Sequence, residues 1–251
     1  MKLPDGMKLM DENGKRKDGR GPNDLRPIKM EVGVLKRADG SAYIEWGNNK
    51  VLAAVYGPRE LHPKHRQESD RGIVQARYNM ASFSVSDRKR PGPDRRSIEI
   101  SKIISEAFTH VVFVEQFPKT TVDVYMEVLQ ASAGTRCAGI TAASIALADA
   151  GVPIRGLVSS CAVGRIAGQV VLDLDKEEDN YGEADMPVAI LSTTGEVLLM
   201  QMDGILTQDE FRKAFGMVKD ACGHITEMQK EALRRKYKPS PQPEEKQGVA
   251  Q

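Results

Sequence analysis

The chain has 251 residues, of which 40% are hydrophobic and 28% charged, so it can bury the core of one large domain or of two small ones. Its 36 basic and 35 acidic side chains give a net charge of +1, which argues against a uniformly basic surface and requires any polyanion site to be local. Three widely spaced cysteines without a CxxC pair, a polar N-terminus without a signal-peptide core, and no apolar run of roughly 18 residues favour a cytoplasmic protein over a secreted, zinc-binding or membrane protein.

Residues 1–25 are polar and rich in glycine, and we expect them to be an N-terminal extension that is ordered only in part. The chain then turns to short runs of β-branched and aromatic residues separated by glycine turns, which predicts a meander of antiparallel strands. The predicted strands of this meander are Ile28–Leu35, Ser41–Trp46 and Val51–Tyr56, and a further strand is predicted at Ile73–Phe83. Residues 57–72 lack any periodicity, and a loop of this length inside a domain usually has a function.

Two long helices are predicted in the middle of the chain. Apolar residues from Ile100 to Val112 recur at the spacing of a helix that packs on a sheet, and the strand Thr120–Leu129 follows Pro118. A second helix is predicted from Thr135 to Gly151, where glycine is a favoured C-terminal residue. Because its alanines and glycines allow close packing, we expect this helix to be central.

The second part of the chain repeats this pattern in shorter form. Two hairpins are predicted, one from Leu157–Gly164 with Val170–Leu174 and one from Pro187–Leu191 with Val197–Met202. A capping box at 207–210 then begins a helix whose apolar face runs to residue 233. We therefore predict an internally duplicated α+β fold with halves 26–153 and 154–237, followed by a proline-rich, disordered tail at 238–251.

The start of the central helix has the residues of an anion-binding site. The strand breaks at Gly134, and the helix start supplies unpaired N–H groups, the hydroxyl of Thr135 and the guanidinium of Arg136. The plainer interpretation makes Thr135 an ordinary N-cap and Arg136 a solvated first-turn residue. A second pair of basic residues, Arg95 and Arg96, precedes the other long helix and favours the anion-binding interpretation.

An acidic stretch runs from Asp173 to Asp185 between two predicted strands. Such clusters are usually solvated loops, but an apolar strand follows Asp185 at once and would hold it at the edge of a sheet. A carboxylate held there can bind a divalent metal or transfer a proton. Arginines, an anion-binding helix start and a carboxylate pair together suit phosphoryl transfer on RNA, where inorganic phosphate must be held beside the scissile phosphodiester.

Four motifs resemble, in order and spacing, those of the ribonuclease PH family, over roughly residues 15–237. They are Lys17-Asp-Gly-Arg-Gly21 with Arg26-Pro27, Pro93-Asp-Arg-Arg96, Gly134-Thr-Arg136, and Glu178-Asp-Asn-Tyr-Gly-Glu-Ala-Asp-Met-Pro187. Within the family they are most similar to the catalytic subunits of archaeal exosomes. The resemblance implies two ribosomal-protein-S5-domain-2-like β-α halves. It also implies a phosphorolytic 3′-to-5′ exoribonuclease that degrades single-stranded RNA to nucleoside diphosphates and can run in reverse to add 3′ tails.

The resemblance also assigns roles to individual residues. Phosphate binding falls to Arg96, Gly134, Thr135 and Arg136. Catalysis and the binding of Mg²⁺ (or Mn²⁺) fall to Asp179 and Asp185, with Asp179 favoured as the general acid. RNA binding falls to Arg95, Arg96, Lys64 and His65, the last two because the 57–72 loop corresponds to the loop that lines the narrow entrance of exosome rings. Solvated or ordinary helix positions are expected for Glu177, Glu178, Glu183, His110 and His224.

The implied partners are single-stranded RNA, inorganic phosphate as co-substrate, and a second, catalytically degenerate ribonuclease PH-like subunit in a hexameric ring of three heterodimers. RNA-binding cap proteins are also implied, and a membrane is not. One alternative is a homohexameric ribonuclease PH that trims tRNA 3′ ends; the sequences 182–187 and 62–65 favour the exosome subunit. Another is a non-catalytic ring subunit that only binds RNA, and the presence of Asp179 and Asp185 favours an enzyme.

Overall fold

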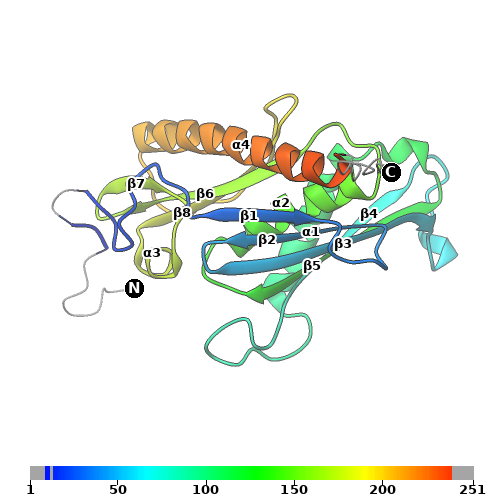
Figure 1. Cartoon of the computed structure of the whole chain (residues 1–251), viewed down its shortest axis with the longest axis horizontal. Coiled ribbons are helices and arrows are strands. Elements are labelled where there is room, and N and C mark those ends of the chain that lie inside the picture. Colours follow the sequence, from blue (N-terminus) through cyan, green and yellow to red (C-terminus); the bar gives the residue numbers. More distant parts are fainter. Residues whose placement is uncertain (1–8, 12–13, 239–251) are drawn as a thin grey trace, which may run out of the picture.

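Five strands of the first half form one sheet in the computed structural model, which describes residues 9–11 and 14–238 (Figure 1). The strand order is β1 (Ile28–Val32), β2 (Gly40–Trp46), β3 (Asn49–Glu60), β5 (Thr120–Gln130) and β4 (Ile73–Met80). Buried and less buried residues alternate along β2 and β3, as they do in strands with one covered face. The predicted meander is confirmed for β1–β3, whereas β4 pairs with β5 in parallel because α1 (Arg95–Val111) makes the crossover between them.

The second sheet contains the two predicted hairpins. Its order is β10 (Asp203–Gly204), β8 (Ala184–Leu191), β6 (Val158–Ile166) and β7 (Gln169–Leu172), and β9 (Val197–Met200) also pairs with β8. All of these pairs are antiparallel. The acidic stretch between β7 and β8 is not a loop throughout, because it contains the short helix α3 (Lys176–Tyr181). Asp175 and Glu178 form a capping box there, and acidic residues stabilise a first helical turn.

Helix α2 (Thr135–Asp149) lies between the two sheets, as its composition predicted. It contacts β2, β3 and β5 on one side and β6 and β8 on the other. All its residues except Arg136 and Ala148 are buried. Helix α4 (Gln208–Tyr237) covers the outside of the second sheet and reaches β1 (Figure 1). Two short 3₁₀ helices, η1 (Lys64–Arg66) and η2 (Val114–Gln116), complete the elements of the described residues.

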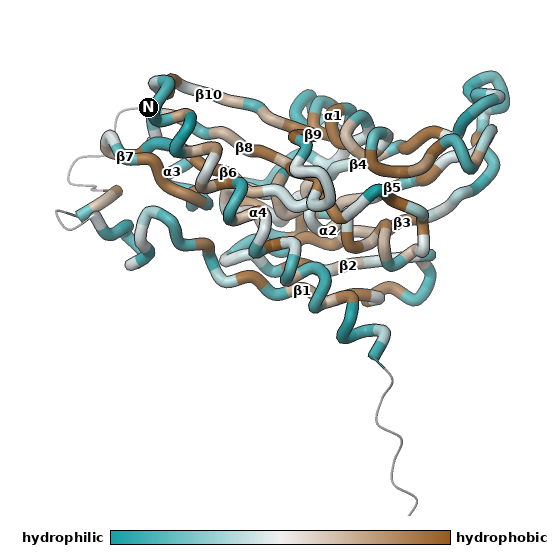
Figure 2. The backbone as a smooth tube through the Cα atoms, turned by 90° about the horizontal axis from the view of Figure 1, so that it is seen from above, coloured by the Kyte–Doolittle hydropathy of each residue, from teal (hydrophilic) through white to brown (hydrophobic). Residues whose placement is uncertain are grey.

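One hydrophobic core runs through both halves, from Met30 on β1 to Ala232 on α4. Figure 2 shows apolar segments of both sheets around α2, and their buried residues belong to this core. A second, smaller apolar cluster under β7 contains Leu9 of the N-terminal extension. This arrangement confirms the predicted α+β class.

The ends of the chain are described only in part. In the N-terminal extension, Leu9 and Arg16 are buried against the second half. The tail that was predicted to be disordered lies, from residue 239 on, outside the described residues. Among the residues that the structure describes, no helix is both long enough and apolar enough to cross a membrane.

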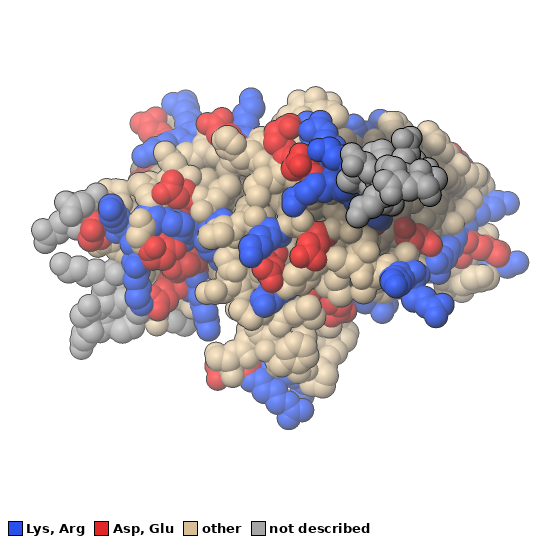
Figure 3. Space-filling model, viewed as in Figure 1, with Lys and Arg blue, Asp and Glu red and all other residues tan. Residues whose placement is uncertain are grey.

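Charges of both signs are interspersed on the face shown in Figure 3. The loop between β4 and α1, residues 81–94, projects from the body and carries Arg88, Lys89 and Arg90. A basic surface is therefore a local feature of this protein, as its net charge indicated.

Candidate active site between the two halves

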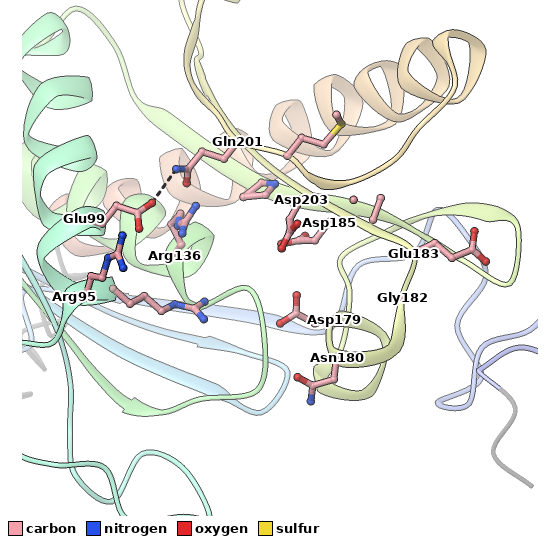
Figure 4. Close-up of a pocket in the computed structure, with 15 residues that line it drawn as sticks. Arg95, Glu99, Arg136, Asp179, Asn180, Gly182, Glu183, Asp185, Gln201 and Asp203 are labelled. Atoms are coloured by element: carbon pink, nitrogen blue, oxygen red, sulfur yellow. Dashed lines mark hydrogen bonds between the residues drawn. The ribbon is translucent and has the colours of Figure 1, made fainter. Parts of the chain in front are cut away.

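A pocket of about 840 Å³ lies where the two halves meet (Figure 4). The first half contributes Arg95, Arg96 and Glu99 from α1 and Arg136 from α2; the second half contributes the other lining residues. These are Asp179, Asn180, Gly182, Glu183, Ala184, Asp185, Pro187, Gln201, Met202, Asp203 and Gly204. One wall of the pocket thus carries three arginines and the opposite wall carries carboxylates.

The anion-binding helix start has the predicted position but not every predicted contact. Gly134 is the N-cap of α2 in a left-handed conformation with φ of 66°, which glycine adopts without strain. Thr135 is therefore the first helical residue and not the cap, and its buried hydroxyl lies 2.7 Å from the hydroxyl of Tyr78. Neither Gly134 nor Thr135 is among the residues that line the pocket, whereas Arg136, in the first turn, is.

The arginines are held at the starts of the two long helices. Arg95 and Arg96 are the first residues of α1 and are exposed, and the N-cap of that helix is Asp94. Asp94 accepts a hydrogen bond of 2.7 Å from the Ser97 N–H, and together with Lys89 this keeps its pKa far below the ordinary value. The Nε of Arg136 is buried and has no hydrogen-bond partner within the described part of the chain. An anion in the pocket would supply that partner.

The two predicted catalytic carboxylates lie near each other on the same wall of the pocket, opposite the arginines (Figure 4). Burial of Asp185 on β8, together with the nearby negative charge of Asp179, raises the pKa of Asp185 to about 7. The Oδ1 atom of Asp185 is buried and lacks a hydrogen-bond partner among the described residues. Asp179 on α3 keeps an exposed surface, yet the pocket walls desolvate its carboxylate enough to raise its pKa against the charges of Arg96, Arg26 and Arg136. The pocket therefore favours one shared proton on this pair near neutral pH.

These carboxylates also fit a divalent cation that is shared with a substrate. Among residues 9–11 and 14–238, no group of three or more His, Cys, Asp or Glu side chains is arranged to hold a metal ion alone. Magnesium is commonly held by only one or two carboxylates, with phosphate oxygens and water completing its shell. The neighbouring carboxylates of Asp179 and Asp185, one of them with a free oxygen, match that donor set.

Three further polar residues of the pocket lie outside the motifs that the sequence analysis singled out. They are Glu99, Gln201 and Asp203. Gln201 donates a hydrogen bond of 3.3 Å to Glu99, which joins the end of β9 to α1 (Figure 4). Asp203 pairs in register with Asp185, and its charge adds to the rise in the Asp185 pKa. The short strand β10 that places Asp203 exists only as a tertiary pairing, so no local pattern signals it.

One expectation from the sequence was wrong, and several of the residues that it named lie outside the pocket. Glu178 was expected to be solvated, but only 1% of it is exposed, because Arg16 pairs with it from a position 162 residues away. Glu177 and Glu183 do keep exposed side chains and pair at the surface with Lys17 and Arg165. The remaining residues named from the sequence lie away from the pocket: Lys64 and His65 are exposed on η1, and His110 and His224 are exposed on α1 and α4.

The chain is similar to known proteins over most of its length. Residues 24–153 match the 3′ exoribonuclease family, domain 1, and residues 156–221 match domain 2 of the same family. The chain is 63% identical over 237 residues to "Exosome complex component Rrp41" of Pyrococcus abyssi, a match that covers 94% of this chain and 95% of that protein. It is 60% identical over 232 residues to the protein of the same name from Thermoplasma acidophilum, covering 92% and 94%.

The fold is also similar to that of a solved structure, the crystal structure of rice (Oryza sativa) Rrp46. The TM-score is 0.78, and the match covers 87% of this chain and all of that chain. At 23% sequence identity, this likeness supports the fold alone.

Proposed function

Because this chain belongs to the 3′ exoribonuclease family of ribonuclease PH-type proteins, we propose that it is the catalytic subunit of an archaeal exosome. In this role it shortens single-stranded RNA from the 3′ end with inorganic phosphate and releases nucleoside diphosphates. The observation that carries the proposal is the pocket in which arginines of one half face the carboxylates of the other.

The arginine wall suits the binding of two anions side by side. Inorganic phosphate is the nucleophile, and it has to approach a phosphodiester that is also negatively charged. Arg96 and Arg136, with the uncapped start of α2, would hold the phosphate, because guanidinium groups and helix N-termini bind it directly. Arg95, beside them on α1, would hold the RNA backbone. The cationic wall thus offsets the repulsion between nucleophile and substrate.

The carboxylate wall suits the leaving group. A phosphate oxygen forms a new bond to the terminal phosphodiester phosphorus, and the bond from that phosphorus to the 3′ oxygen of the preceding nucleotide breaks. The departing 3′ oxygen then takes up a proton. Burial raises the pKa of Asp185 to about 7, so this side chain can still carry a proton near neutral pH. We therefore assign the donor role to Asp185, although the sequence interpretation favoured Asp179. The negative charge of Asp179 helps Asp185 to retain that proton.

Asp179, which carries the negative charge of the pair, would also hold Mg²⁺ or Mn²⁺, with the unprotonated oxygen of Asp185 as a second donor. When bound, such an ion neutralises charge that develops on the phosphate oxygens.

The larger assembly is part of the same proposal. The relatives named above are components of an exosome complex. For this chain we infer a hexameric ring with a catalytically degenerate second subunit, cap proteins that bind RNA, and a cytoplasmic location. The exposed Lys64 and His65 on η1 would contact single-stranded RNA at the entrance of that ring.

The test is phosphate dependence. With a single-stranded RNA labelled along its whole length, the complex of this chain with its ring partner should be inert without phosphate and should release labelled nucleoside diphosphates when phosphate is added. Asp179→Asn should lower the rate by about 100-fold or more while RNA affinity stays nearly unchanged, because the amide neither supports the Asp185 proton nor binds metal.

Arg136→Ala should instead raise the phosphate concentration that is required for phosphorolysis.

The matched control for Asp179→Asn is Glu177→Gln, a change on the same helix at a carboxylate that pairs only with Lys17 at the surface. It should leave the rate near that of the wild type. Release of nucleoside monophosphates without phosphate would contradict the proposed reaction, and wild-type turnover in Asp179→Asn would remove Asp179 from the catalytic pair.

A further inference from the structure

Helix α3 carries Asp179 into the pocket but has few means of holding its own place. It has six residues, and helices this short are not stable by themselves. Its apolar support is slight, because Tyr181 is only partly buried against the small cluster that contains Leu9. The one fully buried side chain of α3 is Glu178, which is a carboxylate. Polar contacts, rather than apolar packing, therefore hold α3 in place.

Glu178 makes hydrogen bonds to residues at both ends of α3 and to a residue outside the helix. Its side chain accepts a hydrogen bond of 2.8 Å from the Asp175 N–H, which closes the capping box. Its backbone carbonyl accepts one of 2.7 Å from the Gly182 N–H at the other end. A buried carboxylate also requires a cation or several donors, because burial without them is unfavourable.

Arg16 of the N-terminal extension supplies the closest cation, and Arg20 Nη2 lies 3.9 Å from the same carboxylate. Its side chain is fully buried, its Nε donates to the Glu178 carboxylate at 2.7 Å, and its Nη2 donates to the other carboxylate oxygen. The same guanidinium donates to the backbone carbonyls of Leu172 at 2.6 Å and Asp173 at 2.8 Å, just beyond the end of β7. Arg16 therefore joins α3 to the second sheet through one planar group whose geometry matches a carboxylate.

This fork also determines the direction of Asp179. Successive residues of a helix point about 100° apart around its axis, so a fixed Glu178 side chain fixes the rotation of the whole helix. Asp179 follows Glu178 directly, and in that rotation it points into the pocket (Figure 4). The side chain of Glu178 is buried in the interior instead. A neighbouring pair, Lys17 with Glu177, also joins the extension to α3, but its side chains are 53% and 38% exposed, and such surface pairs hold little.

We propose that Arg16 is a positioning residue for Asp179: by forking onto buried Glu178, it holds α3 in the rotation that points Asp179 at the pocket. This inference rests on the proposed function, in which Asp179 takes part in phosphorolysis. It gives the N-terminal extension a task in catalysis, through the residue just before the Lys17–Gly21 motif, although Arg16 does not line the pocket itself.

The test uses Arg16→Met and Arg16→Lys in the complex with the ring partner, with Lys17→Ala as the matched control on the surface pair. Arg16→Met should lower kcat roughly 10- to 100-fold, the range that a small misplacement of a catalytic group produces, while the KM for phosphate changes by less than about twofold. Arg16→Lys keeps the charge but cannot donate two parallel hydrogen bonds to the carboxylate. Its kcat should therefore lie between those of Arg16→Met and the wild type. Lys17→Ala should have the kcat of the wild type.

A general loss of folding is separated from misplacement in two ways. The double variant Arg16→Met/Glu178→Leu leaves no unpaired buried charge, so its melting temperature should return towards that of the wild type while its kcat stays low. In the Asp179→Asn background, Arg16→Met should reduce the residual single-turnover rate no further, because a positioning residue acts only through the group it positions.

The outcomes also distinguish this inference from the proposed function. Wild-type kcat in Arg16→Met, with Asp179→Asn still inactive, would overturn the positioning role alone. So would a double variant in which both melting temperature and kcat recover, since Arg16 would then only neutralise a charge. Wild-type turnover in Asp179→Asn would overturn the assignment of Asp179 and, with it, any need to position that side chain.

Discussion

Between about pH 4 and pH 7, Asp185 keeps a proton in the folded protein that it would lose in the unfolded chain. Burial, aided by the charge of Asp179, raises its pKa from 3.8 to about 7. A carboxyl group with a raised folded-state pKa contributes stability that is fully present below the unfolded pKa and is lost as the pH rises through the folded one. Between about pH 4 and pH 7, this side chain therefore makes the protein progressively less stable.

Asp185→Asn should remove this loss, because the amide has a similar shape and no charge to bury. Relative to the wild type, the variant should gain little stability at pH 4, more as the pH rises, and a constant amount above about pH 7. A pKa difference of one unit corresponds to about 1.4 kcal/mol, which makes a gain of a few kcal/mol the upper limit. The measurement is urea unfolding at several pH values with chelator and without phosphate. A stability difference that does not depend on pH would contradict this account.

At the scale of single residues, the motifs predicted which side chains line one pocket, but they did not predict the surroundings of each side chain. Arg95, Arg96, Arg136, Asp179 and Asp185 all line one pocket, as expected from their motifs. The sequence did not predict that Glu178 is buried, because an acidic residue in an acidic stretch looks solvated until its partner is known. The partner of Glu178 is 162 residues away, and no local pattern records a contact over that separation.

Helix α2 shows why small residues matter at the scale of an element. It fits between two sheets, and at its C-terminal end strand β2 approaches so closely that only glycine fits at position 40. A Cβ on Gly40 would lie 2.2 Å from the Ala146 carbonyl oxygen and 2.3 Å from the Ala150 nitrogen. Both are backbone atoms, so a substitution forces a helix or a strand to move.

Gly40→Ala should therefore destabilise the protein by about 1–3 kcal/mol or more, the usual cost of overpacking. Gly139→Ala, inside α2, is the matched control: its Cβ would lie 3.6 Å from Met126 Sδ and 3.8 Å from the Tyr78 ring, which are ordinary contacts. That change should be neutral or stabilise by up to about 1 kcal/mol, because alanine favours helix. Equal free energies of unfolding for the two variants would disprove the close approach as the cause.

Elements with a strong period were predictable, and elements that depend on pairing were not. The stripe of α1 and the alternation of β2 follow directly from the order of apolar residues. Helix α3 was missed because six residues with a mainly acidic composition contain no apolar stripe. The parallel pairing of β4 with β5 was missed because strand direction depends on the crossover and not on the strand itself.

At the scale of the molecule, the two halves are joined by buried polar contacts as well as by the core. Arg26 donates to the Asp173 carboxylate and, at 2.6 Å, to the carbonyl of Ser132, which precedes α2. Trp46 of β2 donates to the same carboxylate at 2.9 Å. Burial alone would raise the pKa of Asp173, but the hydrogen bonds and charge of Arg26 outweigh it and lower that pKa. The duplication was readable from the sequence, but this junction was not.

The isolated chain should be weakly active or inactive. Its pocket offers three arginines, and each neutralised phosphate adds only a modest, salt-dependent increment to RNA affinity. A related but catalytically degenerate subunit should complete the groove and give a three-plus-three hexamer with salt-sensitive activity. Size-exclusion chromatography with light scattering, followed by phosphorolysis at low and high salt, measures both. Full activity of the chain alone, as a homohexamer that no partner stimulates, would instead favour the tRNA-trimming enzyme.

The unequal support of α2 and α3 has a consequence for motion within the site. Arg136 sits on a helix enclosed by both sheets, whereas Asp179 sits on six residues with one buried side chain. Segments with few buried contacts open at a lower free energy than the global unfolding free energy. We therefore expect heating to disorder α3, and with it Asp179, before it disorders α2. The upper working temperature of this enzyme would then be limited by its shortest α-helix and not by its core.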